Sequence, residues 1–108
     1  MKFGHIELEA SDPVASMRFY VDVLGYTLVA NQGNKFVWIE LGGAEYLLRP
    51  TGDYPLPCFV YYADDPAGEA QRLRAAGVDV EEKGTCFHYS DADGHSFQIV
   101  NPGDDHSG

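Results

Sequence analysis

The first ten positions of the chain alternate between apolar and polar residues. One side of an extended backbone would carry Ile6, Leu8 and Ala10, and the other side Phe3, His5, Glu7 and Glu9. This period of two predicts a half-buried strand over residues 3–10. Ser11-Asp12-Pro13 then supplies a helix N-cap and a proline that needs no intrahelical amide bond. Apolar residues then recur at helical spacing, at Val14, Met17, Tyr20, Val21 and Leu24. Gly25 is expected to end this helix.

The rest of the chain reads as short strands separated by turn sequences, with one further helix. Strands are predicted over residues 26–30, 36–41 and 45–49, followed by the proline-punctuated segment 51–57. A strand over 59–63 then precedes a helix that starts at Asp65-Pro66 and ends at Ala76-Gly77. The last strands are predicted over 78–82, 85–89 and 96–101, before a disordered tail over 103–108.

The second half of this pattern repeats the first. Both halves contain the same elements in the same order: a strand, a helix that starts at Asp-Pro and ends at a glycine, and three further strands. Such self-similarity indicates one supersecondary unit used twice. The predicted fold is α+β, with βαβββ modules over about 3–50 and 57–102 in a single domain spanning 1–108. We expect the helix-free faces to form a shared cup-shaped mixed sheet, which is the default ligand site.

Four sequence features carry a resemblance to a known family. They are His5 on the first strand, Asp12 before the helix, the run Phe19-Tyr20…Leu24-Gly25, and Asp91-Ala-Asp-Gly94 before the last strand. With the repeat, they resemble the vicinal oxygen chelate superfamily, which includes glyoxalase I, extradiol dioxygenases, fosfomycin-resistance enzymes and bleomycin-resistance proteins. The resemblance implies a single glyoxalase/bleomycin-resistance-like domain and a homodimer.

The resemblance also implies where a metal would be held. In metal-binding members the ligands come from positions that correspond here to His5, Leu47, Cys58 and Gln98. His5 is the preferred ligand type and Gln98 is tolerated in some members, but the set is incomplete at Leu47 and Cys58. The implied cofactor is therefore either none or one divalent metal, such as Zn, Ni, Mn or Fe.

Alternation predicts which side chains face the cup, independently of the family. In the strand 36–41 the aliphatic stripe of Val37, Ile39 and Leu41 should face the helices. Phe36, Trp38 and Glu40 should then face the cup. The same reasoning gives a predicted set of ligand-binding residues: Phe36, Trp38, Glu40, Cys58, Tyr62 and His88. Glu7 and Glu45 are candidate general acid–base catalysts, since burial in a cup would favour proton transfer. Four other aromatic residues are interpreted as core: Phe19, Tyr20, Phe59 and Phe97.

Composition narrows the classes of partner. The net charge of −10 and pI near 4.5 argue against nucleic acid and anionic membranes. This acidic charge is compatible with a cationic small-molecule ligand. The alternative is that the acidic surface serves only solubility. Cys58 and Cys86 lie in apolar runs and are expected to be reduced, as in a cytoplasmic protein. No apolar run is long enough for a membrane span, so a cytoplasmic location is expected.

Two functions of different classes follow from these observations. The first is binding of a small organic ligand, cationic or planar aromatic, in the manner of the drug-sequestering bleomycin-resistance proteins. The alternative is a divalent-metal-dependent lyase, isomerase, thiol transferase or dioxygenase of the glyoxalase type. A structural or partner-binding module is a third possibility, for which the acidic surface is the main hint.

Overall fold

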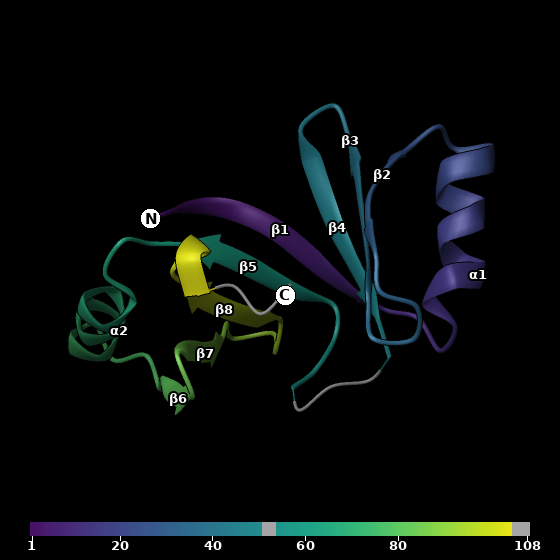
Figure 1. The fold of residues 1–108 in the computed structure, drawn as a ribbon. Coiled ribbons are helices and arrows are strands. Elements are labelled where there is room, and N and C mark those ends of the chain that lie inside the picture. Colours follow the sequence, from purple (N-terminus) through teal and green to yellow (C-terminus); the bar gives the residue numbers. More distant parts are fainter. Residues whose placement is uncertain (51–53, 105–108) are drawn as a thin grey trace. The chain divides into compact units, whose positions relative to one another are not determined.

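The computed structural model describes residues 1–50 and 54–104, which divide between two units (Figure 1). The first unit is His5–Pro57, and the second unit combines Met1–Gly4 with Cys58–Gly108. Strand β1 (Lys2–Glu9) contributes to both, because its first residues belong to the second unit and the rest to the first. The strands form a mixed sheet of eight strands, and each unit follows the expected order βαβββ.

The first unit contains β2 (Thr27–Asn31), β3 (Val37–Leu41) and β4 (Ala44–Arg49), arranged β2-β3-β4-β1. Strand β4 runs parallel to β1 and antiparallel to β3, and β2 pairs antiparallel with β3. Helix α1 (Pro13–Arg18) begins where predicted, with the Asp12 carboxylate accepting the Ala15 amide at 3.2 Å. This helix lies on one side of the unit's sheet (Figure 1).

The helical segment after α1 differs from the prediction of one regular helix. From Phe19 to Val23 it is a π-helix, η1, and the Leu24 amide donates to the Phe19 carbonyl at 3.2 Å. The wider turn rotates Leu24, which was expected in the apolar stripe, around the helix axis, and Leu24 is 46% exposed. Phe19 and Val23 lie outside that stripe and are 53% and 68% exposed. The prediction that Phe19 is a core residue is therefore wrong, whereas Gly25 does end the segment with a φ of 84°.

The core of the first unit lies between α1 and the sheet. Ala10, Val37, Ile39 and Leu48 are buried there, and side chains of the helical segment pack on them: Val14, Met17, Tyr20 and Val21. This confirms the predicted aliphatic stripe at Val37 and Ile39. Leu41, expected in the same stripe, is exposed at the last position of β3 beside the glycine turn.

The second unit contains β5 (Cys58–Tyr62), β6 (Glu81–Lys83), β7 (Cys86–Ser90) and β8 (Ser96–Val100), with β5 beside the start of β1. Their order is β5-β8-β7-β6, and β5 and β8 run parallel. Helix α2 (Pro66–Ala75) starts at an Asp65 cap, whose carboxylate accepts the Gly68 amide at 3.1 Å. Its buried Ala70 packs with Ala63, Val80, Phe87 and Ile99.

Two boundaries in the second unit differ from prediction. The strand expected over 78–82 occurs only as β6, because the Val78 amide bonds to the Leu73 carbonyl at 2.9 Å and closes the end of α2. Val78 and Val80 pack against the α2 core instead. The predicted tail begins with a 3-10 turn, η2 (Pro102–Asp104), while positions 51–53 and 105–108 lie outside the described residues.

Two further expectations concern the thiols and the membrane. Cys58 is buried and Cys86 half-buried, and neither is in a disulfide within the described ranges. Across residues 1–50 and 54–104, no helix has the length and apolar character needed to cross a membrane.

Candidate functional site

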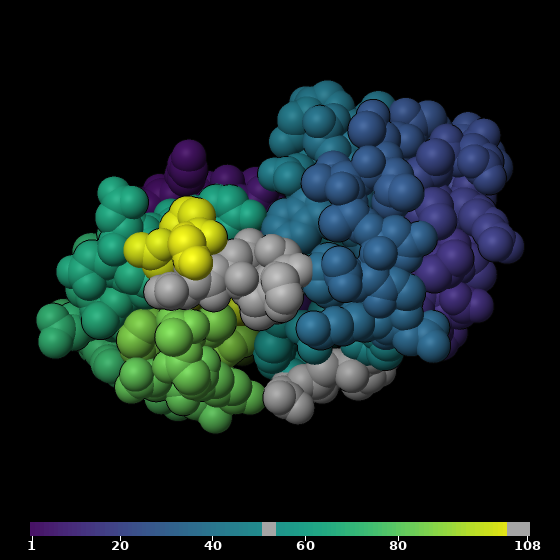
Figure 2. Space-filling view, viewed as in Figure 1, coloured from purple at the N-terminus to yellow at the C-terminus, as the bar shows by residue number. Residues whose placement is uncertain are grey.

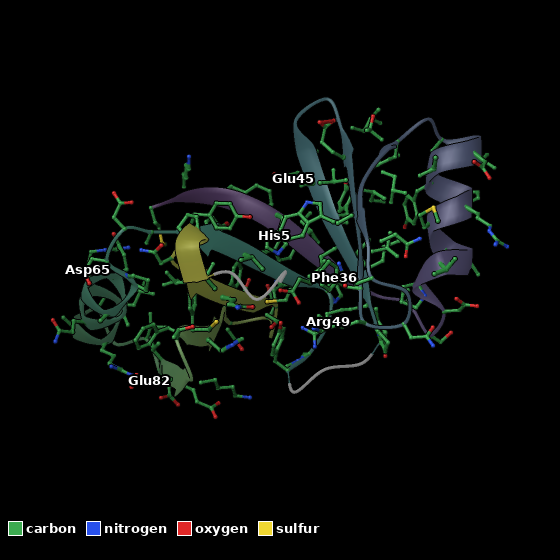
Figure 3. All side chains as sticks on the ribbon, in the orientation of Figure 1. His5, Phe36, Glu45, Arg49, Asp65 and Glu82 are labelled. Carbon is green, nitrogen blue, oxygen red and sulfur yellow. The ribbon has the colours of Figure 1, made fainter. Side chains whose placement is uncertain are left out.

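The face of the first unit's sheet opposite α1 gathers several of the predicted site residues. We call it the helix-free face. Glu7 on β1 and Trp38 on β3 are both register partners of Leu47 on β4, so the three side chains form one row. Figure 3 shows the His5 and Glu45 side chains on the side of this sheet away from α1. Period-two alternation therefore placed these side chains on the correct face.

The helix-free face holds a fully buried carboxylate. Glu7 is 0% exposed, and its Oε1 accepts the Tyr54 hydroxyl at 2.6 Å and an Arg49 guanidinium N–H at 3.2 Å. The same guanidinium donates to the Tyr54 hydroxyl oxygen at 2.9 Å. His5 Nε2 lies 3.7 Å from the other carboxylate oxygen. These four residues form the Glu7 cluster, in which a guanidinium and a hydroxyl supply charge pairing and hydrogen bonds to one oxygen of the buried carboxylate.

Sequence reasoning missed two members of the Glu7 cluster, Arg49 and Tyr54. Tyr54 lies in the proline-punctuated segment, and its hydrogen bond to Glu7 spans 47 positions of sequence. The segment reads as an ordinary linker, and no local spacing signals such a contact. Only the fold brings the two residues together.

Trp38 is held in a defined orientation on the helix-free face. Its indole N–H donates to Glu45 Oε1 at 2.8 Å, and its ring centroid lies 4.7 Å from that of His5. Phe36 and Leu47 are buried beside it. Trp38 itself is 8% exposed, and Glu45 is half-buried.

Two carboxylates lie opposite one another next to Trp38. Glu40 and Glu45 are register partners in the β3–β4 ladder, and both are half-buried. Side chains directly opposite in an antiparallel pair lie about 4.5–5.5 Å apart at Cβ, where like charges are destabilising. Within the described part of the chain, no basic side chain forms an ion pair with either residue. We call Glu40 and Glu45 the acidic pair.

The second unit also has a face opposite its helix. Phe87 and Tyr89 pack in the α2 core, so Cys86 and His88 point to the other side, as alternation predicts. There His88 and Val60 are both register partners of Gln98. Gln98 is 1% exposed, and its Oε1 has no hydrogen-bond partner among the residues described. Cys58 and Tyr62 share this parity on β5.

The donors of the first unit do not fit a resident divalent metal. Leu47 occupies one of the positions that the resemblance assigns to a ligand, and its buried hydrocarbon side chain packs with Phe36 and Trp38. Beside His5, the Glu7 carboxylate already accepts bonds from Arg49 and Tyr54. Among the described residues of the chain, no three His, Cys, Asp or Glu side chains lie close enough together to hold a metal ion. Binding of metal by His5 and Gln98 stays a prediction without a complete ligand set.

The Asp91-Ala-Asp-Gly94 sequence forms a turn that is closed by its own side chain. Asp91 Oδ1 accepts the amides of Asp93 and His95 at 3.0 and 2.9 Å, and Oδ2 lies 2.7 Å from His95 Nδ1. The bond with the His95 side chain, followed by the backbone bond, lowers the pKa of Asp91 below its usual 3.8. The motif therefore serves to fix the entry into β8.

Comparisons with known proteins agree with this fold. Residues 5–100 match the model of the glyoxalase-like domain. The chain is 30% identical over 109 residues to "Glutathione transferase FosA" of Serratia marcescens, covering 89% of this chain and 77% of that protein. A glyoxalase/bleomycin resistance protein/dioxygenase superfamily member from Vibrio splendidus 12B01 is 25% identical, with a TM-score of 0.68 and coverage of 91% and 97%. Catechol 2,3-dioxygenase shares the fold at 16% identity and a TM-score of 0.66, over 93% of this chain and 39% of that one.

Proposed function

Because the chain belongs to the glyoxalase-like domain family, we propose that it binds a small planar aromatic cation on the helix-free face of its first unit. The observation that carries this proposal is the acidic pair beside Trp38. Two opposed carboxylates that have no basic partner among the described residues form a site of negative potential. A cationic ligand would relieve that repulsion.

Trp38 supplies the second half of the recognition. Tryptophan is the side chain best suited to hold a cation over its ring, and such contacts contribute about 0.5–2 kcal/mol. The bond from its indole N–H to Glu45 fixes the ring next to a carboxylate before a ligand arrives. A site fixed in this way loses little side-chain entropy on binding. Phe36 is buried in the same cluster and supports the Trp38 ring by packing beside it.

The Glu7 cluster has a supporting role in this proposal. Its carboxylate is already compensated by Arg49 and Tyr54, so it adds little attraction for a second cation. By holding β1 to β4, the cluster fixes the position of His5, against which the Trp38 ring packs. In this proposal Glu7 has a positioning function, and Glu45 both orients Trp38 and binds the cation, in place of the predicted acid–base catalysis.

The test uses Trp38 as its own reporter, since it is the only tryptophan of the chain. Ethidium, a planar aromatic cation, should quench Trp38 fluorescence saturably, whereas the anionic dye 8-anilinonaphthalene-1-sulfonate should bind more weakly. The double variant Glu40→Gln/Glu45→Gln removes both charges but keeps an oxygen acceptor for the indole. We expect it to weaken ethidium binding about tenfold or more. Asp22→Asn, which removes an exposed carboxylate on η1, is the matched control. Equal affinity of the double variant and the wild type would refute the proposal.

A second candidate function is thiol transfer. It is favoured by the 30% identity to a protein whose name is glutathione transferase. In this case the Glu7 carboxylate, close to His5, would be the group that accepts a proton from a thiol. Glutathione and 1-chloro-2,4-dinitrobenzene provide the assay, with and without added Mn²⁺. Turnover that is lost in Glu7→Gln would favour this function over simple binding, and absence of turnover would remove it.

A further inference from the structure

A pocket of about 430 Å³ lies entirely within the second unit, and Tyr62 is the one predicted site residue in its wall. It is lined by Met1, Lys2, Tyr62, Ala63, Asp64 and Pro102. Its volume falls within the range of about 300–1,000 Å³ that is typical of small-molecule sites. We propose that this pocket binds a small zwitterion of the amino-acid class that carries an aromatic group. The proposal is independent of the function assigned to the first unit.

The position of the pocket follows from the topology of the unit. Strands β5 and β8 are parallel, so their carboxyl ends lie at the same edge of the sheet, beside the start of β1. The carboxyl ends of parallel strands are a common place for ligands in open sheets. Figure 2 shows the N-terminal residues in purple and the yellow segment that follows β8 near one another on this side of the unit.

Hydrogen bonds fix the loops around the pocket. The Ala63 amide donates to the Val100 carbonyl at 2.9 Å, which extends the β5–β8 pairing to the end of both strands. The Asn101 side-chain amide then donates to the Asp64 carbonyl at 3.2 Å. The loop after β5 and the segment after β8 are therefore tied together at the point where they border the pocket.

One wall of the pocket is an aromatic ring seated on a glycine. A Cβ added to Gly4 would lie 2.5 Å from Tyr62 Cε1 and 2.6 Å from Cζ, so the ring packs directly on the Gly4 backbone. Glycine is required there because any side chain would displace the ring. Tyr62 is thereby a fixed, flat surface, and such a surface suits offset stacking with another ring.

The charges of the lining indicate the class of ligand. The α-ammonium group of Met1 is already paired, 3.7 Å from Glu69 Oε2. The other charged residues of the lining are Lys2 and Asp64, one of each sign, and both are exposed. A ligand with one carboxylate and one ammonium group complements both, and its aromatic side chain would contact Tyr62.

The experiment is an NMR titration of ¹⁵N-labelled protein with L-phenylalanine. Saturable shifts of the Ala63 and Asp64 amides are expected. Two comparators each lack one charge: phenethylamine has no carboxylate, and 3-phenylpropanoate has no ammonium. Both should bind about threefold to tenfold more weakly, as expected for partly exposed ionic contacts. Equal binding of either comparator, or no saturable shift with L-phenylalanine, would overturn the proposal.

Substitutions in the protein test the same assignment of Asp64 to the ammonium group and Lys2 to the carboxylate of the ligand. Asp64→Asn should weaken L-phenylalanine binding but leave 3-phenylpropanoate unchanged, and Lys2→Met should weaken L-phenylalanine binding but leave phenethylamine unchanged. Both positions are exposed, so neither change threatens folding. Glu82→Gln, on the exposed strand β6 at the far edge of the unit, is the matched control (Figure 3). Glu40→Gln/Glu45→Gln should bind L-phenylalanine as the wild type does, which separates this site from that of the first unit.

Discussion

Replacing Tyr54 with phenylalanine tests whether the Glu7 cluster stabilises the first unit. The change removes one hydroxyl and keeps the ring near the Arg49 guanidinium, whose carbon lies 5.5 Å from the ring centroid. The lost hydroxyl donates to a carboxylate oxygen at 2.6 Å and accepts from Arg49 at 2.9 Å. The perturbation therefore acts on one donor to a fully buried acceptor.

The expected magnitude follows from that geometry. A hydrogen bond to a charged group contributes about 1.5–3 kcal/mol, against about 0.5–1.5 kcal/mol for a neutral pair. Glu7 is 0% exposed, so water cannot replace the missing donor without a rearrangement. We expect Tyr54→Phe to lower the free energy of unfolding by about 2 kcal/mol. With an m-value of about 1.5 kcal/mol per molar urea, the unfolding midpoint falls by about 1.3 M.

Urea unfolding followed by Trp38 fluorescence measures this change, because the ring lies on the same face as the cluster. A double-mutant cycle with Glu7→Gln then isolates the charge. When Glu7→Gln is already present the acceptor is neutral, so adding Tyr54→Phe should lower the free energy of unfolding by only about 1 kcal/mol.

The matched control is Tyr61→Phe, whose ring packs edge-on against Phe3 in the second unit. Removing its hydroxyl should change the free energy of unfolding by less than about 0.5 kcal/mol. If Tyr54→Phe were no more destabilising than this control, or if the cycle showed no coupling, the Glu7 cluster would not stabilise the fold as reasoned here.

Four further predictions follow from the contacts described. Ile39→Ala should cost about 2–5 kcal/mol in urea unfolding, since Ile39 is fully buried beneath α1, whereas Phe19→Ser should stay within about 0.5 kcal/mol because that ring is exposed. If the two variants changed the free energy of unfolding by similar amounts, the assigned burial of Ile39 and exposure of Phe19 would be contradicted. Glu40→Gln should raise the free energy of unfolding by about 0.2–1 kcal/mol, because it relieves repulsion with the cross-strand partner Glu45. A lower free energy of unfolding would show that the pair is not repulsive. The lowered pKa of Asp91 means that its contribution to stability is present above the usual pKa of 3.8 and is lost as the pH falls through the lowered value. His95→Ala should therefore raise the pKa of Asp91, measured by carboxyl ¹³C NMR, and an unchanged midpoint would contradict this.

Much of the fold could be predicted because its strands each bury one face. Val37 and Ile39 had to face a helix once Trp38 and Glu40 alternated with them, and the structure confirms this for both aliphatic residues. The Asp-Pro helix starts were equally informative, since Asp12 and Asp65 cap their helices in the same way. At these positions the residues that determine the local structure are neighbours in sequence, so the sequence alone was sufficient to predict it.

The missed features depend on contacts that a local pattern does not contain. The π-helical turn that precedes the exposed Leu24 arises from one shifted hydrogen bond, which leaves the apolar spacing of the sequence unchanged. Glu7 could be placed on the correct face, but its partners could not be identified. Arg49 and Tyr54 lie 42 and 47 positions away from it in sequence.

The two acidic features of the helix-free face are stabilised very differently, and this contrast bears on function. The chain provides Glu7 with a guanidinium and a hydroxyl, as the burial of a carboxylate demands. Among the described residues it provides no basic partner for Glu40 and Glu45, although they oppose one another in the ladder and one of them orients Trp38. A purely structural face would gain stability from a neutral or basic residue at either position. In the function proposed above, a ligand of positive charge would supply the missing partner, so the same residues that weaken the free protein would strengthen its complex.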